Sequence, residues 1–576
     1  MKKQNRRSTV FVLLAGMILA FATWIALAVG AADPIEYVYF DLAAGSVTIN
    51  NDGYSGKVYL YGTNTTKMIS GQHTNDTHYY IYQSTAGTRA TSGYNADTDE
   101  YVLPKHTEVK VGSRAWGDFI TNNTDMDDVI ATWDSAAGTT AGRTATSNRI
   151  NISLVGYNGS TGTYFDSVNH ENALCDITLD NVWSSYQDKD YGGLNILGLA
   201  EAKGQATLGF TDIVVNLKGD SRMHSVYYAT GSTANSATGD DSTLTFNSYF
   251  GNGREEGSLT VIGIQEKKKN CGSYQGSGNN VYFNHWNSVI GGTDSNDHSM
   301  GMYFNGGTVY AASAPLDNCT AIGGGGNGTG EVTINGGRVT AVAYTTGTAI
   351  GGGIAHTGVG GIGIVQINGG KVYAYNYGQP AYQTVSNFGS ANAEQKWAAS
   401  HVAGTAIGGA SSILQNGSKG TVTVTGGTVY AESLGGSGLG GGNSVSKAGG
   451  EAVINISGGS VTAKSTKQDY YAVVNGKDYH VAAGAAIGGG TGGIGGNGGN
   501  ATINISQADP LVPTTVKTGS MGGGGTNNPS GKTGYASVTM SGGSLQGQIV
   551  MAKGGTKGCS FTMTGGTLSN TDFICL

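Results

Sequence analysis

The chain has 576 residues, of which 99 are glycine and only 7 are proline, a composition that excludes both collagen and a proline-rich linker. Charged residues make up only 12% of the sequence, whereas a disordered chain of this length would carry many more. The formal net charge of −7 argues against nucleic-acid binding, which needs a basic surface.

The first 32 residues are organised like an export signal. Basic side chains between residues 2 and 7 precede an uncharged apolar run at 10–29, and small residues that suit cleavage follow. The run is longer than a usual signal core, so an uncleaved N-terminal membrane anchor is the alternative, because ~20 apolar residues can span a bilayer. Either interpretation predicts that the rest of the chain is extracellular, at the cell surface.

The stretch from 33 to 300 is predicted to be β-rich but irregular. FDLAAGSVTIN at 40–50 alternates apolar and polar residues around a glycine, and CDITLDNVW at 175–183 has the same period of two. Helical spacing with caps is missing throughout the sequence. We expect a β-rich cap or accessory region at 33–150 and irregular coils at 151–300.

A glycine-punctuated repeat fills residues 301–576. Its core unit reads Φ-x-Φ-x-G-G-x-Φ-x-A, where Φ is apolar, and a second element of the type AIGGG lies between copies. The clear copies are MYFNGGTVYA (302–311), VTINGGRVTA (332–341), VQINGGKVYA (365–374), VTVTGGTVYA (422–431) and INISGGSVTA (454–463). Longer spacings between copies indicate loop insertions at 375–403 and 464–483.

Each copy alternates with the period of a strand, so Val332 and Ile334 face one side and Thr333 and Asn335 face the other. Only glycine readily takes the positive φ that a tight corner demands, and it leaves room for the next turn of the chain. One unit cannot bury its apolar side alone, whereas stacked copies bury a continuous core. We therefore predict an all-β, right-handed parallel β-helix of the pectin-lyase-like class, with one repeat per coil and three short faces.

Stacked coils place equivalent outward residues in columns about 4.8 Å apart. The column before the corner contains Asn305, Asn335, Asn368, Thr425, Ser457, Ser541 and Thr564. We expect this column either to face a ligand or to join coils by side-chain hydrogen bonds.

A second column lies four residues after the first corner glycine. It contains Tyr310, Thr340, Tyr373, Tyr430 and Thr462. Its tyrosines are predicted to form a platform on which sugar rings stack, with Arg338 and Lys371 nearby to bind hydroxyls. The alternative is that tyrosine favours exposed strands and packs against its neighbours across coils.

The two inserted loops are another candidate binding region, because loops on a rigid scaffold often carry binding residues. Both are rich in aromatic side chains. These are Tyr375, Tyr377 and Trp397 in the first loop, and Tyr470 and Tyr471 in the second.

Catalytic and metal-binding patterns are weak. The loop with Asp294 and Asp297 has the oxygen-rich composition of a Ca²⁺ site, which is also the composition of a solvated turn. Asn-Thr-Asp at 123–125 and Gly-Asp-Asp at 239–241 match two elements of a polygalacturonase site, but its other two elements have no counterpart. Glycoside hydrolysis needs two opposed carboxyl groups, and the clean repeats offer few outward carboxylates. We therefore expect no catalytic residue and no cofactor.

The opening FDL-x-x-G-x-VTI, the segment DITLDNV and the array of GGxVxA and AIGGG together resemble large exported β-helix surface proteins of gut Firmicutes. These proteins are described as carbohydrate-binding-domain-containing or adhesin-like. The resemblance implies a non-catalytic role at the cell surface, with glycans or host extracellular matrix as partners. Two alternatives stay open: a structural stalk or spacer without a specific ligand, and a polysaccharide lyase or glycoside hydrolase of the β-helix class.

Overall fold

The computed structural model is all-β, and none of the residues that it describes is helical. It describes residues 36–50, 57–61, 66–70, 77–84, 94–95, 100–101, 146–153, 157–158, 163–164, 173–184, 186, 192–197, 211–229, 243–250, 254–255, 257–263, 266–268, 281–283, 288–292, 301–313, 319–343, 346–354, 358–377, 403–412, 414–465, 472–474, 477–479, 483–528, 530–551 and 558–575. The export signal predicted at 1–32 lies outside these residues.

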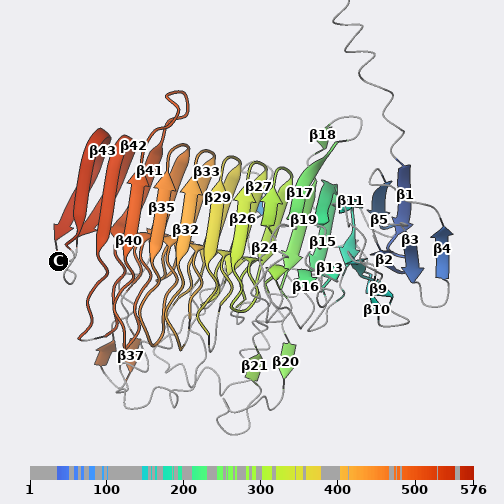
Figure 1. Cartoon of the computed structure of the whole chain (residues 1–576), viewed down its shortest axis with the longest axis horizontal. Helices are drawn as coiled ribbons and strands as arrows, with labels where there is room; N and C mark the ends of the chain where they lie inside the picture. The colour runs from blue at the N-terminus through green and yellow to red at the C-terminus, as the bar shows by residue number, and fades with distance from the viewer. Residues whose placement is uncertain are drawn as a thin grey trace, which may run out of the picture.

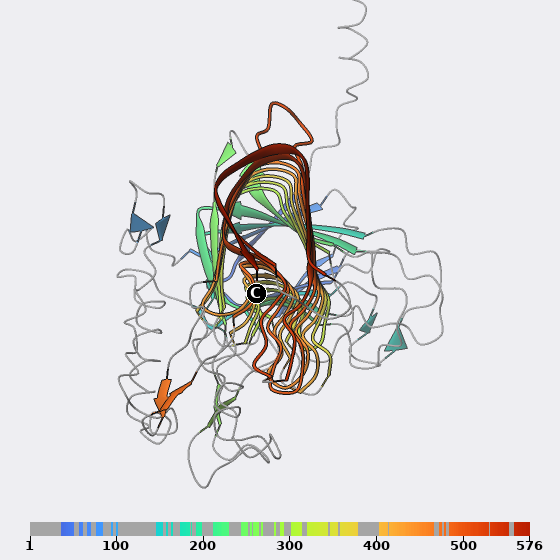
Figure 2. The same ribbon diagram turned by 90° about the vertical axis from the view of Figure 1, so that its left-hand side faces the viewer.

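One large sheet winds nearly closed round a long axis as a right-handed parallel β-helix (Figures 1 and 2). The predicted fold class is therefore confirmed. The strands stack along the axis from β1 at one end to β43 at the other (Figure 1). Each complete coil contributes one strand to each of three faces, and strands on the same face pair in parallel.

The three faces have the following strands. The first face contains β1 (Glu36–Asp41), β5 (Thr77–Tyr82), β11 (Ala173–Asp180), β14 (Thr211–Lys218), β17 (Thr243–Phe250), β23 (Gly301–Phe304), β26 (Gly330–Ile334), β29 (Gly363–Ile367), β32 (Gly420–Val424), β35 (Ala452–Ile456) and β40 (Ala501–Ile505). The second face contains β12 (Trp183–Ser184), β15 (Asp220–His224), β19 (Ser258–Ile262), β24 (Thr308–Ala312), β27 (Arg338–Ala343), β30 (Lys371–Asn376), β33 (Thr428–Ser433) and β36 (Ser460–Ser465). The third face contains β2 (Ser46–Asn50), β8 (Ile150–Ser153), β13 (Leu194–Leu197), β16 (Val226–Ala229), β22 (Ile290–Gly292), β25 (Ile322–Gly323), β28 (Ile350–Gly351), β31 (Ile407–Gly408), β34 (Leu439–Gly440) and β39 (Ile487–Gly488).

The last strands turn the corners without a break. β41 (Thr515–Gly522) covers the second and third faces, and β42 (Ala536–Met551) and β43 (Ser560–Cys575) cover all three. The remaining described strands form short antiparallel pairs outside the coils. They are β3 (Lys57–Tyr61) and β4 (Thr66–Ser70) beside β2, β6 (Tyr94–Asn95) with β7 (Glu100–Tyr101), β9 (Tyr157–Asn158) with β10 (Thr163–Tyr164), β18 (Arg254–Glu255) beside β17, β20 (Glu266–Lys268) with β21 (Val281–Phe283), and β37 (Ala472–Val474) with β38 (Lys477–Tyr479).

The coil geometry begins with the first described strand, well before the clean repeat. β1 pairs with β5 and β5 with β11 on the first face, while β2 pairs with β8 and β8 with β13 on the third. The segment that we expected to form a cap or accessory region, 33–150, thus contains strands of the same parallel sheet. An antiparallel extension, β2–β3–β4, is added to these first coils.

The core follows the alternation predicted from the repeat. Val332 and Ile334 are fully buried, whereas Thr333 between them is half-buried on the outer side. The irregular coils fill the same interior with larger side chains, and the rings of Phe246 and Phe304 stack with their centroids 5.0 Å apart. Apolar side chains from every coil join into one continuous hydrophobic cluster.

Glycine is required at the two positions of each corner for two different physical reasons. Gly337, the second glycine, has φ of 69°, a conformation that side chains with a Cβ rarely adopt. Gly336, the first, lies so close to the coil before it that an added Cβ would be 2.5 Å from the carbonyl oxygen of Asn305. The positive φ recurs at the second glycine of the other corners, Gly307, Gly370, Gly427, Gly459, Gly543 and Gly566. Both predicted roles of the corner glycines are confirmed.

Glycine has a further use that the sequence analysis did not anticipate. Between each third-face strand and the next first-face strand of the array, the chain makes a loop of two limbs. The described residues of these loops, at 324–329, 352–362, 409–419, 441–451, 489–500 and 523–535, stack into a narrow projection from the ring of strands (Figure 2), which we call the glycine fin.

Backbone hydrogen bonds zigzag between the two limbs of the fin. Gly450 donates its N–H to the carbonyl of Gly442 at 2.7 Å, and the carbonyl of Gly450 accepts from Gly490 of the next coil at 3.0 Å. The alternation runs unbroken from Gly328 to Gly534. A Cβ on Gly441 would lie 2.1 Å from the carbonyl oxygen of Gly450 on the opposite limb, so the limbs approach too closely for a side chain at that position. This contact explains much of the glycine excess.

Candidate functional site

The predicted tyrosine column exists and lies in strict register on the second face. Tyr310, Thr340, Tyr373, Tyr430 and Thr462 are successive partners across β24, β27, β30, β33 and β36. Each of the three tyrosines is half-buried and alternates along its strand with buried residues. The stacking of coils therefore brings together side chains that are up to 120 positions apart.

Two more tyrosines lie beside this column, in a segment that we had expected to be an inserted loop. β30 continues to Asn376, so Tyr375 belongs to the sheet and not to the loop predicted at 375–403. The rings of Tyr375 and Tyr377 stack with centroids 5.9 Å apart and planes 7° apart, and Tyr375 lies 5.6 Å from the ring of Tyr430. We call Tyr310, Tyr373, Tyr375, Tyr377 and Tyr430 the tyrosine surface.

The tyrosine surface covers an apolar patch on the outside of the sheet. Ala312 and Val342 point away from the main core but are fully buried, because Tyr310, Tyr375 and Tyr377 pack against them. Buried apolar contacts beneath the rings restrict their rotamers. A ligand would therefore meet rings that are already ordered, which lowers the entropic cost of binding.

Charged side chains hold the rings in place. The guanidinium of Arg338 lies 4.8 Å from the centroid of Tyr373, as a cation–π contact. Arg338 thus covers a ring face, where we had expected it beside the hydroxyls. Lys371, its register partner on β30, is exposed at the edge of the surface.

A lysine and a glutamate that the sequence analysis did not single out complete the surface. Lys464 donates to the hydroxyl of Tyr430 at 2.7 Å and lies 4.9 Å from its ring centroid, and this hydroxyl donates to the carboxylate of Glu432. Glu432 and Lys464 are register partners on β33 and β36. The signal that would have found them is their position two residues after the tyrosine column, which points to the same side of the strand.

The phenols of Tyr377 and Tyr430 stay neutral over the physiological pH range. Burial, with the nearby charge of Glu432, raises the pKa of Tyr377 to about 12. Burial and the hydrogen bond to Glu432 raise the pKa of Tyr430 above its ordinary value. The surface therefore offers aromatic rings with hydroxyls that both donate and accept hydrogen bonds.

The asparagine column joins coils, as one of our two interpretations predicted. Asn335 donates to Asn305 at 2.8 Å, and Asn368 donates to Asn335 at the same distance. The ladder begins outside the repeat, at Asn247, and ends where Thr425 donates to Asn368. Its side chains hydrogen-bond to each other along the first face, so their amides stabilise the stacking of the coils.

The irregular coils contain a charged network that the sequence analysis missed. On the first face, the hydroxyl of Tyr80 donates to Asp180 at 2.5 Å and accepts from Lys218 at 2.7 Å. The ammonium of Lys218 also lies 3.3 Å from Asp180 and 5.3 Å from the ring centroid of Tyr249. Burial and the bond to Asp180 raise the pKa of Tyr80 to about 12, while its bond to Lys218 acts in the opposite direction. Tyr80 and Tyr249 are 169 positions apart in the sequence, so no local motif marks these residues.

A histidine beside this network has the hydrogen-bond partners of a catalytic relay, but a substrate cannot reach the hydroxyl group in it. His78 has one ring nitrogen 3.1 Å from Asp176 and the other 2.6 Å from the hydroxyl of Thr178. Thr178 is fully buried, so a substrate cannot reach its hydroxyl. We interpret the arrangement as a structural link between adjacent coils.

Several predicted site residues lie outside the described residues. They are Asp294, Asp297, Trp397, Tyr470 and Tyr471. Within the described ranges, no group of three or more His, Cys, Asp and Glu side chains is placed to hold a metal ion. In the same part of the chain, no helix is both long and apolar enough to cross a membrane.

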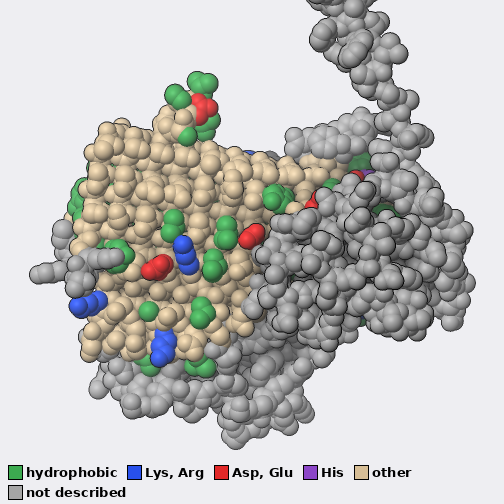
Figure 3. Space-filling view, in the orientation of Figure 1, with side chains coloured by type: hydrophobic (Ala, Val, Ile, Leu, Met, Phe, Trp, Pro, Cys, Tyr) green, Lys and Arg blue, Asp and Glu red, His purple; other side chains and the backbone are tan. Residues whose placement is uncertain are grey.

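Few charged side chains interrupt the repeat coils on the face of the molecule shown in Figure 3. Comparison of the chain with protein-family models, with curated proteins and with solved structures gave no match.

Proposed function

We propose that this chain is a non-catalytic, exported surface protein of the adhesin type, which binds carbohydrate or host matrix glycans through the tyrosine surface. The observation that carries the proposal is the convergence of five tyrosines on one outward face over an apolar base. Neutral aromatic rings with polar tips suit the mixed apolar and hydroxyl-bearing faces of sugars. The cations of Arg338 and Lys464 lock two of the rings in position.

A structural spacer is the second candidate, and a separate observation favours it. The asparagine ladder and the hydrogen-bond zigzag of the glycine fin both run along the axis over many coils. Such ladders make a rod stiff without any ligand. The spacer role and the adhesin role are compatible, because a stiff rod also presents a binding surface away from its point of attachment.

The test is an array of glycans and matrix proteins probed with the full chain and with a Tyr310→Ala, Tyr373→Ala, Tyr430→Ala variant. The matched control is Thr340→Ala with Thr462→Ala, which alters the same column without removing a ring. We expect the parent and the threonine variant to bind, and the tyrosine variant to lose at least about tenfold in affinity.

Equal thermal unfolding of the three proteins shows that a loss reflects the site and not the fold. Binding that survives the loss of the three tyrosines would reject the tyrosine surface as the binding site. If the parent bound no glycan or matrix protein, the spacer would be the better account.

A further inference from the structure

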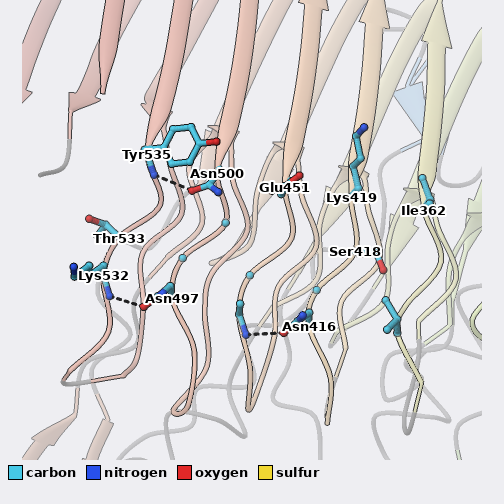
Figure 4. A pocket seen from close by; sticks show the side chains of 16 residues that line it. Ile362, Asn416, Ser418, Lys419, Glu451, Asn497, Asn500, Lys532, Thr533 and Tyr535 are labelled. Atoms are coloured by element: carbon cyan, nitrogen blue, oxygen red, sulfur yellow. Dashed lines mark hydrogen bonds between the residues drawn. The ribbon is translucent and has the colours of Figure 1, made fainter. Parts of the chain in front are cut away.

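A groove runs along the molecule where the glycine fin joins the first face (Figure 4). Its volume of about 820 Å³ is in the range of small-molecule and oligomer sites. Five successive coils line it, and each coil contributes the last residues of its loop before the first-face strand. The groove is therefore built by repetition, one equivalent segment per coil.

Backbone hydrogen bonds set the register of these segments. Gly417 donates to the carbonyl of Ala448, Gly449 to that of Asn497, and Gly498 to that of Lys532, each at 2.9 Å. The glycines form the floor of the groove. One rail consists of Val359, Asn416, Ala448, Asn497 and Lys532, and the other, next to the strands, consists of Ile362, Lys419, Glu451, Asn500 and Tyr535.

The asparagines of both rails are held in one orientation. The Oδ1 atom of Asn416 accepts the N–H of Ala448 at 3.2 Å, and that of Asn497 accepts the N–H of Lys532 at 2.9 Å. Asn500 makes the same contact with Tyr535 at 3.1 Å (Figure 4). Among the described residues, the Nδ2 groups of these three asparagines have no acceptor. They are ordered donors at the groove, available to a ligand.

The charged residues of the groove are also unused by the described part of the fold. Lys419, Glu451 and Lys532 are exposed, and none of them forms an ion pair with another described residue. Between its two ends, the groove is lined by Lys419, Glu451 and the ordered amides, with Ala448 as an apolar residue among them, and Lys532 lies on the last coil. Apolar side chains lie at one end, where Val359 and Ile362 are 59% and 42% exposed, and Tyr535 lies at the other end.

We propose that this groove binds a linear, hydroxyl-rich glycan that lies parallel to the solenoid axis. A surface that repeats once per coil, every 4.7–4.9 Å, suits a ligand that is itself a chain of similar units. Five coils span roughly 19 Å, which is long enough for several sugar rings. Amide donors, ammonium groups and a carboxylate bind hydroxyls, and the ring of Tyr535 offers an apolar face to a sugar ring.

This groove is distinct from the tyrosine surface and shares with it only the proposed class of ligand. It would select for chain length, because each additional sugar would reach the equivalent residues of another coil. A peptide lacks such a uniform repeat and is the competing ligand.

The experiment measures, by calorimetry with the full chain, the affinity for linear oligomers of glucose, mannose and galacturonic acid with two to six units. The variant is Asn416→Asp with Asn497→Asp, which keeps an acceptor for each backbone N–H but removes both donors. Asn455→Asp is the matched control, because Asn455 accepts from Asn504 through Oδ1 at 2.9 Å on the first-face strands and lies outside the groove.

We expect the affinity of the parent to rise with chain length and then level off, and the groove variant to lose about tenfold or more. The control and the Tyr310, Tyr373, Tyr430 variant should bind these oligomers as the parent does. If only the tyrosine variant lost affinity for the oligomers, the groove would be rejected as the binding site and the tyrosine surface would be retained. Binding of an extended peptide library in place of the sugars, or of no probe at all, would also overturn the proposal.

Discussion

The coils before residue 300 and the repeat coils after it share one backbone geometry but differ in how their outer faces are stabilised. On the first face, the early coils are joined by charged and aromatic contacts such as Tyr80 with Asp180 and Lys218. The repeat coils are joined there by identical asparagines, as between Asn305 and Asn335. Inside, both regions bury alternating apolar side chains in one cluster. The alternation therefore defines the coil, whereas the outward residues are free to vary.

The third face shows the sharpest difference. The register position that Gly291 occupies in β22 is occupied by Tyr227 in the preceding coil, and by glycine in every later coil as far as Gly522. In the repeat, this glycine has a positive φ at most coils and touches the next carbonyl. The last two coils have Val550 and Ile574 at this position. Glycine is thus a requirement of the coils from β22 to β41 and not of the β-helix in general.

The largest effect is expected from Gly408→Ala, which tests this requirement. Gly408 has φ of 137°, and an added Cβ would lie 2.0 Å from the carbonyl oxygen of Gly440. We expect the free energy of unfolding to fall by about 3 kcal/mol or more, measured by urea denaturation.

The control is Gly435→Ala, where an added Cβ would meet only the Cβ of Ala403 at 3.7 Å. That change should stay within about 0.5 kcal/mol of the parent. Equal stability of the two variants would contradict the close backbone contact and would remove the distinction between the two sets of coils.

A smaller effect should separate the two kinds of outer contact. Lys218→Met leaves Asp180, whose side chain is only 18% exposed, without its cation, and we expect a loss of about 1–3 kcal/mol. Asn335→Ala removes exposed hydrogen bonds of the ladder and should cost about 0.5–1 kcal/mol.

Lys517→Met is the control for the loss of a lysine, since Lys517 is exposed on the second face. It should leave the urea midpoint almost unchanged. If Asn335→Ala lowered the free energy of unfolding more than Lys218→Met, the outer contacts of the repeat coils would be the stronger ones, contrary to our expectation.

The last effect appears only at alkaline pH, and both regions should show it. The pKa values of Tyr80 and Tyr377 are raised to about 12 in the folded chain, above the ordinary value of 10.0. The unfolded chain therefore loses these protons first. The stability that the neutral phenols contribute is present below pH 10 and is lost as the pH rises toward 12.

Tyr377→Phe should make the free energy of unfolding less dependent on pH between 10 and 12, by about 2 kcal/mol at most. Tyr80→Phe should act in the same direction in the early coils. The measurement is urea unfolding at several pH values between 8 and 12. An unchanged pH dependence in Tyr377→Phe would show that burial does not hold this phenol neutral.

The repeat made much of the fold predictable. Its period of two predicted which side chains are buried, as at Val332 and Ile334, and its glycine pairs predicted the corners at Gly336 and Gly337. The asparagine column and the tyrosine column were both located by counting from the corner. Local sequence is enough for these features because each copy carries the same pattern and stacking repeats it.

The first coils and the glycine fin were not predictable in the same way. β1 and β5 are 41 positions apart along the chain, measured from Glu36 to Thr77, and no shared motif marks their pairing. The limbs of the fin were visible in the sequence only as loops rich in glycine. Their contact depends on which backbone atoms face each other across two limbs, and a sequence pattern does not contain that information.

The sequence by itself determined the class of architecture, the spacing of the coils and the residues that point outward. The tertiary structure alone decided which outward residues meet. Lys464 reaches Tyr430 from the next coil, Tyr375 joins the sheet, and the rails of the groove align Asn416 with Asn497. The physical reason is that periodicity determines the direction of a side chain relative to its own strand, whereas contacts between coils depend on the lengths of the loops that separate them.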